Sequence, residues 1–139
     1  MFSASIEHEV PFFDADSYRI VWHGHYVKYF EIARCKLLDE LDCRYDDMEA
    51  NGYFFPVIDL HIKYIKPLRF GQRIRIIATL KEWQQRLKIH YVVNDVETGE
   101  KLTKGHTIQV AIAMPEEITQ FESPTFLKER IAAVLEKSQ

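Results

Sequence analysis

The residues best suited to chemistry lie in one segment near the N-terminus, at positions 14–34. Asp14 and Asp16 follow an apolar stretch, and after a short connector His23 precedes a long apolar segment with helical spacing. This order places a carboxylate near the start of a helix, where free backbone N–H groups and the positive end of the helix dipole stabilise developing negative charge. A base beside such an oxyanion site is a minimal arrangement for hydrolysing an activated acyl bond.

The elements around this segment are predicted from the spacing of apolar residues. The interval 24–42 is predicted as a helix, and a second, shorter helix is predicted over 45–50. Before them, 4–13 is predicted as a strand that Pro11 interrupts. After Gly52 the pattern changes to strict alternation, which indicates half-buried strands. Their apolar faces run from Ile58 to Tyr64, Ile74 to Leu80, Leu87 to Val93 and Ile108 to Met114.

The order strand, helix, four strands, helix predicts an α+β fold, with one domain over residues 1–139. Short connections among the last four strands predict an antiparallel meander. One long apolar helix and one sheet must bury each other. We therefore expect an antiparallel five-stranded sheet wrapped around a long central helix. Ser123 and Pro124 are expected to open a C-terminal helix, with the serine as N-cap and the proline at the first helical position.

Composition argues against several other classes of protein. A formal net charge of −3 over 139 residues argues against general nucleic-acid binding. No apolar run approaches the roughly 18 residues that a membrane span requires, and a secretory signal is not expected because no basic segment precedes an apolar core. Cys35 and Cys43 fit no metal or redox spacing, and free thiols suit a reducing cytoplasm, which is the expected location.

The ordered run from Asp14 to Arg34 resembles the 4-hydroxybenzoyl-CoA thioesterase family of hotdog-fold acyl-CoA thioesterases. It reads Asp-x-Asp-x-x-x-Ile-Val-Trp-His-x-x-Tyr-x-x-Tyr-Phe-Glu-x-Ala-Arg. The resemblance implies a hotdog fold and hydrolysis of an acyl-CoA to a free acid and coenzyme A. It also implies a homodimer or homotetramer with the site at a subunit interface, and no cofactor besides the coenzyme A of the substrate.

The resemblance also assigns roles to two residues. Asp16 matches the family's catalytic carboxylate and would act as general base or as nucleophile. His23 matches the helix start whose backbone N–H polarises the thioester carbonyl. Simpler interpretations stand beside these roles, because aspartate is common in turns and histidine can cap a helix. Two histidines, His23 and His25, make a weak metal site without a third nearby ligand, so no metal is expected.

The predicted substrate-binding residues are Arg19, Trp22, Tyr26, Glu31, Lys63 and Lys66. Tyr26 either lines the acyl pocket or belongs to the core. Glu31 either pairs with Arg34 on the helix surface or serves as a second candidate carboxylate. Arg19 stands where many family members have glycine, so the connector either runs differently or brings a charge to the site.

A basic stretch follows between Leu60 and Lys88, with eight cationic residues against the single acid Glu82. Coenzyme A phosphates need such a region, although a solvated sheet face has the same composition. An acidic acyl carrier protein is the alternative carrier of the acyl group, and a non-catalytic acyl-CoA-binding module is the alternative outside the enzymes. The strand 57–66 is expected to pair with its copy in a dimer.

Overall fold

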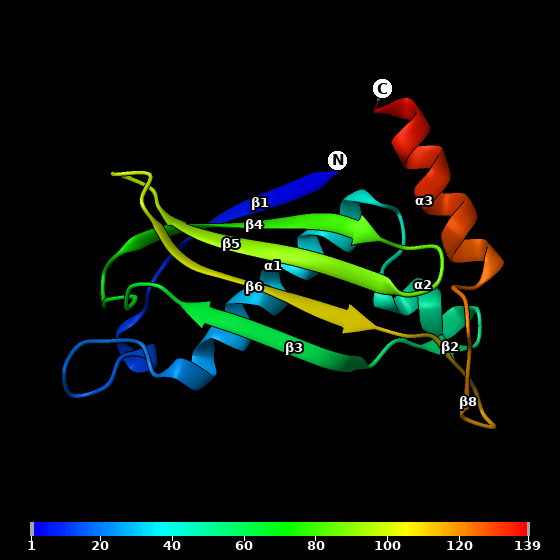
Figure 1. The fold of residues 1–139 in the computed structure, drawn as a ribbon, viewed down its shortest axis with the longest axis horizontal. Coiled ribbons are helices and arrows are strands. Elements are labelled where there is room, and N and C mark those ends of the chain that lie inside the picture. Colours follow the sequence, from blue (N-terminus) through cyan, green and yellow to red (C-terminus); the bar gives the residue numbers. More distant parts are fainter. Residues whose placement is uncertain (1, 139) are drawn as a thin grey trace.

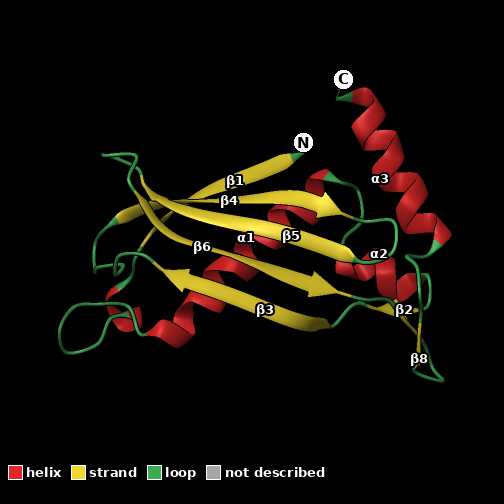
Figure 2. Ribbon diagram, in the orientation of Figure 1, coloured by secondary structure: helices red, strands yellow, loops and turns green. Residues whose placement is uncertain are grey.

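Five strands curl around one long helix, α1 (Tyr26–Glu40), in the computed structural model, which describes residues 2–138 (Figure 1). The strands are β1 (Ser3–Glu9), β3 (Val57–Tyr64), β4 (Arg73–Glu82), β5 (Leu87–Asp95) and β6 (Lys101–Gln109). They are antiparallel neighbours in the order β1-β4-β5-β6-β3. Figure 2 shows α1 crossing behind the sheet, so one face of the sheet packs on α1 and the other faces away. The predicted five-stranded sheet around a central helix is the observed arrangement.

The core lies between α1 and the sheet. The predicted helical stripe is buried at Tyr26, Phe30, Ala33, Leu37 and Leu41. The ring of Phe30 stacks on Tyr91 of β5, with centroids 4.4 Å apart. Gly105 of β6 permits this approach, because a Cβ there would lie 2.2 Å from the carbonyl oxygen of His61 and 2.8 Å from the Phe30 ring. The close packing therefore depends on glycine at one sheet position.

The predicted meander is wrong in one place, because β3 pairs with β6 and not with β4. The connection after β3 does not turn back tightly. Its buried Leu68 lies at the N-terminal end of α1, where its N–H donates to the Tyr26 hydroxyl at 3.0 Å and its carbonyl accepts from Val21 N–H at 2.8 Å. These bonds lead the chain across the end of the sheet, so β4 starts beside β1.

The predicted bounds near the N-terminus also differ from the observed ones. β1 ends at Glu9, and after Pro11 a 3₁₀ helix, η1, covers Phe12–Asp14. Proline has no N–H to continue a strand ladder. The predicted helix 24–42 is a 3₁₀ turn, η2 (His23–His25), followed by α1. The chain leaves α1 through Asp42, whose φ of 57° lies in the left-handed region.

Short elements gather at the other end of the sheet. Helix α2 (Tyr45–Ala50) has the predicted bounds. Strands β2 (Tyr53–Phe54), β7 (Ile112–Ala113) and β8 (Ile118–Thr119) form a small second sheet that was not predicted. Two-residue strands carry no alternation to detect. As a result, the last predicted strand is divided between β6 and β7.

Helix α3 (Thr125–Lys137) begins one residue after the predicted position. Pro124 is extended, with ψ of 152°, and is itself the N-cap residue. The predicted serine cap is therefore wrong. Ser123 instead donates its backbone N–H to the carbonyl of Gln84 at 3.0 Å, and its buried hydroxyl has no hydrogen-bond partner within residues 2–138.

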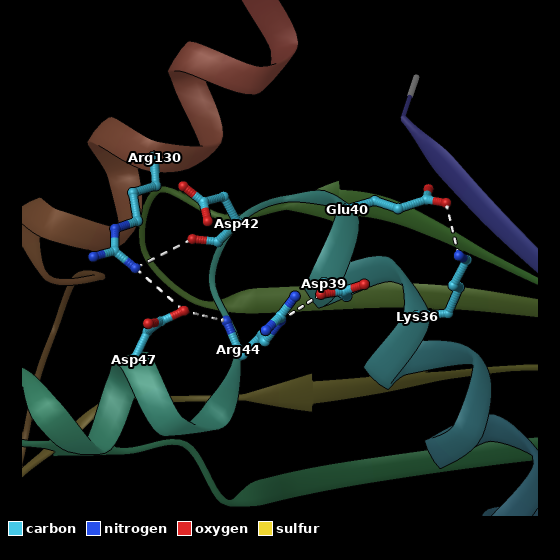
Figure 3. Close-up of polar contacts among 7 residues, drawn as sticks. All are labelled: Lys36, Asp39, Glu40, Asp42, Arg44, Asp47 and Arg130. Atoms are coloured by element: carbon cyan, nitrogen blue, oxygen red, sulfur yellow. Dashed lines mark hydrogen bonds and ion pairs between the residues drawn. The ribbon is translucent and has the colours of Figure 1, made fainter.

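A polar network joins α3 to the connector between α1 and α2 (Figure 3). Arg130 of α3 donates to the carbonyl of Asp42 at 3.2 Å and pairs with Asp47 at 3.3 Å. Asp47 also accepts from the backbone N–H of Arg44 at 3.0 Å, and the Arg44 guanidinium pairs with Asp39 near the end of α1. Such exposed pairs contribute little free energy singly, but together they connect α3 to the segment between α1 and α2.

Candidate active site

Asp16 lies in the exposed loop between η1 and η2. Backbone N–H groups of the same loop hold its carboxylate in place. Oδ1 accepts hydrogen bonds from the N–H groups of Tyr18 at 2.8 Å and Ile20 at 3.3 Å. Within the described part of the chain, Oδ2 has no hydrogen-bond partner. One carboxylate oxygen therefore holds the group in place, and the other is available to water or a substrate.

The same loop contains Arg19 at the position where the related family often has glycine. The φ of Arg19 is 64°, in the left-handed region that glycine adopts without strain. Its N–H donates to the carbonyl of Asp16 at 2.9 Å, and its carbonyl accepts from Phe70 N–H at 3.0 Å. The loop thus has a glycine-like backbone at Arg19.

His23 begins the turn that leads into α1. Its carbonyl accepts a hydrogen bond from the Tyr64 hydroxyl at 2.9 Å, which ties the turn to the end of β3. The N–H groups of His23 and Gly24 are the first of the helical segment, and neither donates a hydrogen bond within residues 2–138. Gly24 lets the Trp22 ring lie over the turn, because a Cβ at Gly24 would lie 2.2 Å from the ring in this position.

One cavity of about 330 Å³ connects these groups. It is lined by Asp16, Ile20, Val21, Trp22, His23, Tyr26, Tyr64, Ile65, Lys66 and Pro67. The structure therefore brings both predicted catalytic residues to one space, together with three of the predicted substrate-binding residues, Trp22, Tyr26 and Lys66. The ammonium group of Lys66 also pairs with Glu100 at 2.6 Å.

The other predicted substrate-binding residues do not line this cavity. Arg19 belongs to the adjacent loop, Lys63 lies on the opposite face of β3 from Tyr64, and Glu31 is exposed on α1. The alternative pairing of Glu31 with Arg34 is absent from the described residues. Arg34 is buried and donates to the hydroxyl of Tyr45 at 2.8 Å.

Tyr26 fits both of its interpretations. Its ring lines the cavity and packs edge-on against Tyr64, with centroids 4.7 Å apart. Its side chain is also buried in the core, where the hydroxyl accepts from Leu68 N–H. Burial raises the pKa of the hydroxyl, so the group stays protonated. Sequence reasoning missed the cavity residues Tyr64, Ile65 and Pro67, because they resemble ordinary strand and turn residues.

Asp14 is the buried polar centre beneath the loop. Its carboxylate accepts hydrogen bonds from Lys28 Nζ at 2.6 Å and from the Tyr29 hydroxyl at 2.7 Å, and His25 Nδ1 lies 3.9 Å away. Burial alone would raise the pKa of Asp14, but the bonds from Lys28 and Tyr29 outweigh it and hold the pKa below its usual value. No local sequence pattern indicated these partners of Asp14.

A curled antiparallel sheet around one long helix defines a hotdog fold, and the carboxylate and the helix start at one cavity make that cavity the candidate active site. The chain belongs to the thioesterase-like superfamily, whose family model matches residues 10–131. Over 77 residues it is 34% identical to "Putative acyl-CoA thioesterase YneP" of Bacillus subtilis, and over 94 residues it is 33% identical to "Putative esterase sll0410" of Synechocystis.

These matches cover 55% and 67% of this chain, but 56% and 57% of the two relatives, so the aligned region spans little more than half of their length. The crystal structure of a 1,4-dihydroxy-2-naphthoyl-CoA thioesterase from Synechocystis superimposes with a TM-score of 0.83. That alignment covers 94% of this chain and 96% of the other at 20% identity. This likeness concerns the fold alone, and it confirms the predicted hotdog fold. Among residues 2–138, no helix is long and apolar enough to cross a membrane.

Proposed function

We propose that the protein is a thioester hydrolase that converts an acyl-CoA to a free carboxylic acid and coenzyme A. The observation that carries this proposal is the shared cavity of Asp16 and His23. Asp16 Oδ2 either removes a proton from the attacking water or attacks the carbonyl carbon itself. The carbonyl oxygen gains negative charge beside the N–H groups of His23 and Gly24. The C–S bond then breaks, and the thiolate of coenzyme A leaves and takes up a proton. If Asp16 attacks directly, the acyl group is left on Asp16 as an anhydride, which water hydrolyses to release the free acid and restore the carboxylate.

The remaining cavity residues suit the two ends of such a substrate. Trp22 and Tyr26 offer apolar surface to the acyl group. Lys66, at the same cavity, supplies a cation for the phosphates of coenzyme A once the exposed pair with Glu100 opens. The similarity to the putative acyl-CoA thioesterase of Bacillus subtilis supports the choice of an acyl-CoA substrate.

The free edge of the sheet supports a homodimer as the working unit. Among residues 2–138, β3 has a neighbouring strand on one side only, and its apolar residues Val57, Ile58, Leu60 and Tyr64 are 41 to 59% exposed. The opposite edge, β1, is protected by polar side chains, as edge strands of monomers commonly are. Two copies joined at β3 would extend the sheet and cover this apolar edge. The cavity residues Tyr64 and Ile65 lie at the end of β3, so the partner would complete the cavity wall.

We place the protein in the cytoplasm, because both of its cysteines are free thiols and a reducing compartment preserves them.

The activity is tested by thiol release from a panel of acyl-CoA substrates. Asp16→Asn should reduce kcat/KM by at least 100-fold, since a lost general base costs about 10²–10⁴-fold, while the melting temperature stays near that of the wild type. Asp46→Asn, at another exposed aspartate, is the matched control. Wild-type turnover by Asp16→Asn would remove Asp16 from its role. Parallel assays with acyl groups on acyl carrier protein would identify the preferred carrier.

A further inference from the structure

The face of the sheet that points away from α1 carries three histidines on neighbouring strands. His61 of β3 lies opposite His106 of β6, which lies opposite His90 of β5. The ring centroids are 5.5 Å apart for the first pair and 5.8 Å for the second. Tyr91, the neighbour of His90 in β5, is buried against α1, so strand alternation directs the histidine row outward. This is the face toward the viewer in Figures 1 and 2.

Four lysines lie near this row: Lys104 lines the hollow at the row, Lys63 lies opposite Lys104, and Lys81 and Lys88 are close enough for their charges to act on His90. Lys63 and Lys104 face each other across β3 and β6, on the same face as the His61–His106 pair. Within residues 2–138, none of the four lysines forms an ion pair. By contrast, Arg73, Arg75 and Arg86 of the same basic stretch each pair with a glutamate. The positive charges of the four lysines near the histidine row are therefore not neutralised by ion pairs among the described residues.

A hollow of about 250 Å³ opens at the histidine row. It is lined by His61, His90, Tyr91, Val92, Lys104, Gly105 and His106. This space would hold several water molecules, at about 30 Å³ each. Among the described residues that line the hollow there is no carboxylate, and imidazole N–H groups and an ammonium group supply hydrogen-bond donors. Its size and chemistry suit a compact anion that carries several charges.

We propose that this hollow binds an oligophosphate anion, a ligand with at least two linked phosphoryl groups. Phosphoryl oxygens are strong acceptors for charged donors, and neighbouring cations favour them further. A metal ion fits less well, because the imidazole planes of His61 and His106 lie within 11° of each other and stack instead of converging. A second copy of this face would set lysine against lysine. The proposal does not depend on the hydrolase activity.

Anion binding in the hollow should be coupled to protonation of His90. Burial, followed by the charges of Lys81, Lys88 and His106, lowers the pKa of His90. Lys63 and Lys104 add positive charge from β3 and β6, and Asp59 of β3, opposite Ile108, adds a carboxylate on the same face. Glu7 and Glu9 of β1 add two more at the far edge, opposite Arg75 and Arg73 of β4. A bound anion opposes the lysine charges and favours protonated imidazole. Binding should therefore take up protons and strengthen as the pH falls.

Titration calorimetry of the full chain with inorganic pyrophosphate tests this site, at fixed ionic strength and at pH 6 and pH 8. We expect at least tenfold tighter binding at pH 6, with proton uptake shown by two buffers of different ionisation enthalpy. His106→Gln and Lys104→Gln should each weaken binding at least fivefold at pH 6. Lys128→Gln on α3 is the control, and its pyrophosphate binding and its thiol release from acyl-CoA should stay unchanged.

Competition experiments separate the two sources of such an anion. Displacement of pyrophosphate by ADP but not by coenzyme A would indicate a free nucleotide-type ligand. Displacement by coenzyme A, with a raised KM for acyl-CoA in His106→Gln, would indicate the phosphates of the substrate. The proposal is overturned if pyrophosphate does not bind at pH 6, or if both variants bind it like the wild type. If a variant fails to fold, ring-proton spectra of the wild-type histidines replace it: shifts on adding pyrophosphate support the site, and unchanged spectra overturn it.

Discussion

Asp14 and Lys28 join the N-terminal loop to the first turn of α1 through a 2.6 Å contact between Oδ1 and Nζ. The carboxylate is buried, at 2% exposure, whereas the lysine is half-exposed. Tyr29 donates its hydroxyl to the second oxygen of the same carboxylate. Because Asp16 lies two residues beyond Asp14, this contact holds the proposed base against the helix that His23 opens.

The charge of Asp14 should contribute to stability above its ordinary pKa. The folded-state pKa lies below the unfolded value, so the contribution is present at neutral pH and is lost as the pH falls through the folded pKa. We expect Asp14→Asn to reduce the free energy of unfolding by about 2 kcal/mol at pH 7. Urea denaturation at pH 7, 5 and 3 should show this difference shrinking toward pH 3. A difference that is constant with pH would contradict the prediction.

The left-handed backbone conformation at Arg19 should lower the stability of the folded protein. Arg19→Gly and Arg19→Ala both remove the guanidinium group, but only glycine relieves the conformational cost of the φ of 64°. We expect the glycine variant to be more stable than the alanine variant by about 1 kcal/mol. Thermal unfolding of the two variants measures the difference. Equal melting temperatures would show that the residue is not strained in solution.

The hydroxyl of Tyr64 should matter more for activity than for stability. It holds the carbonyl of His23 from the end of β3, at an exposed position where water can replace it. Tyr64→Phe should lower kcat/KM for thiol release about fivefold, which corresponds to about 1 kcal/mol for one hydrogen bond, with little change in melting temperature. Tyr18→Phe removes an exposed hydroxyl from the neighbouring loop and is the control. Equal losses in both variants would argue against the positioning role of Tyr64.

The β3 edge should control assembly. Ile58→Lys places a charge on the exposed edge, where it would have to be desolvated between two copies. Light scattering should show a dimer for the wild type and a shift toward monomer for this variant. Phe121 is 98% exposed and lies outside β3, so Phe121→Lys is the control and should stay dimeric. A wild-type mass equal to one chain, 16.5 kDa, would contradict the dimer.

Local patterns predicted the elements of this fold well. The helical stripe from Tyr26 to Leu41 and the alternation after Gly52 depend on side chains a few residues apart, and the sheet around α1 followed from them. The bounds of α2 were also correct. The pairing of β3 with β6 was missed because it depends on Leu68, whose partner Tyr26 lies far away in the sequence. No short-range pattern contains that contact.

For the candidate site, too, some features followed from the sequence and others only from the tertiary structure. The sequence by itself determined which residue types were present: the carboxylates Asp14 and Asp16, and His23 ahead of an apolar helix. Only the tertiary structure decided their positions. It buried Asp14 against Lys28 and left one oxygen of Asp16 without a partner among the described residues. It also brought the end of β3 to the His23 turn. The physical reason is that burial and hydrogen bonding depend on which distant segments meet, whereas spacing along the chain specifies only the local conformation.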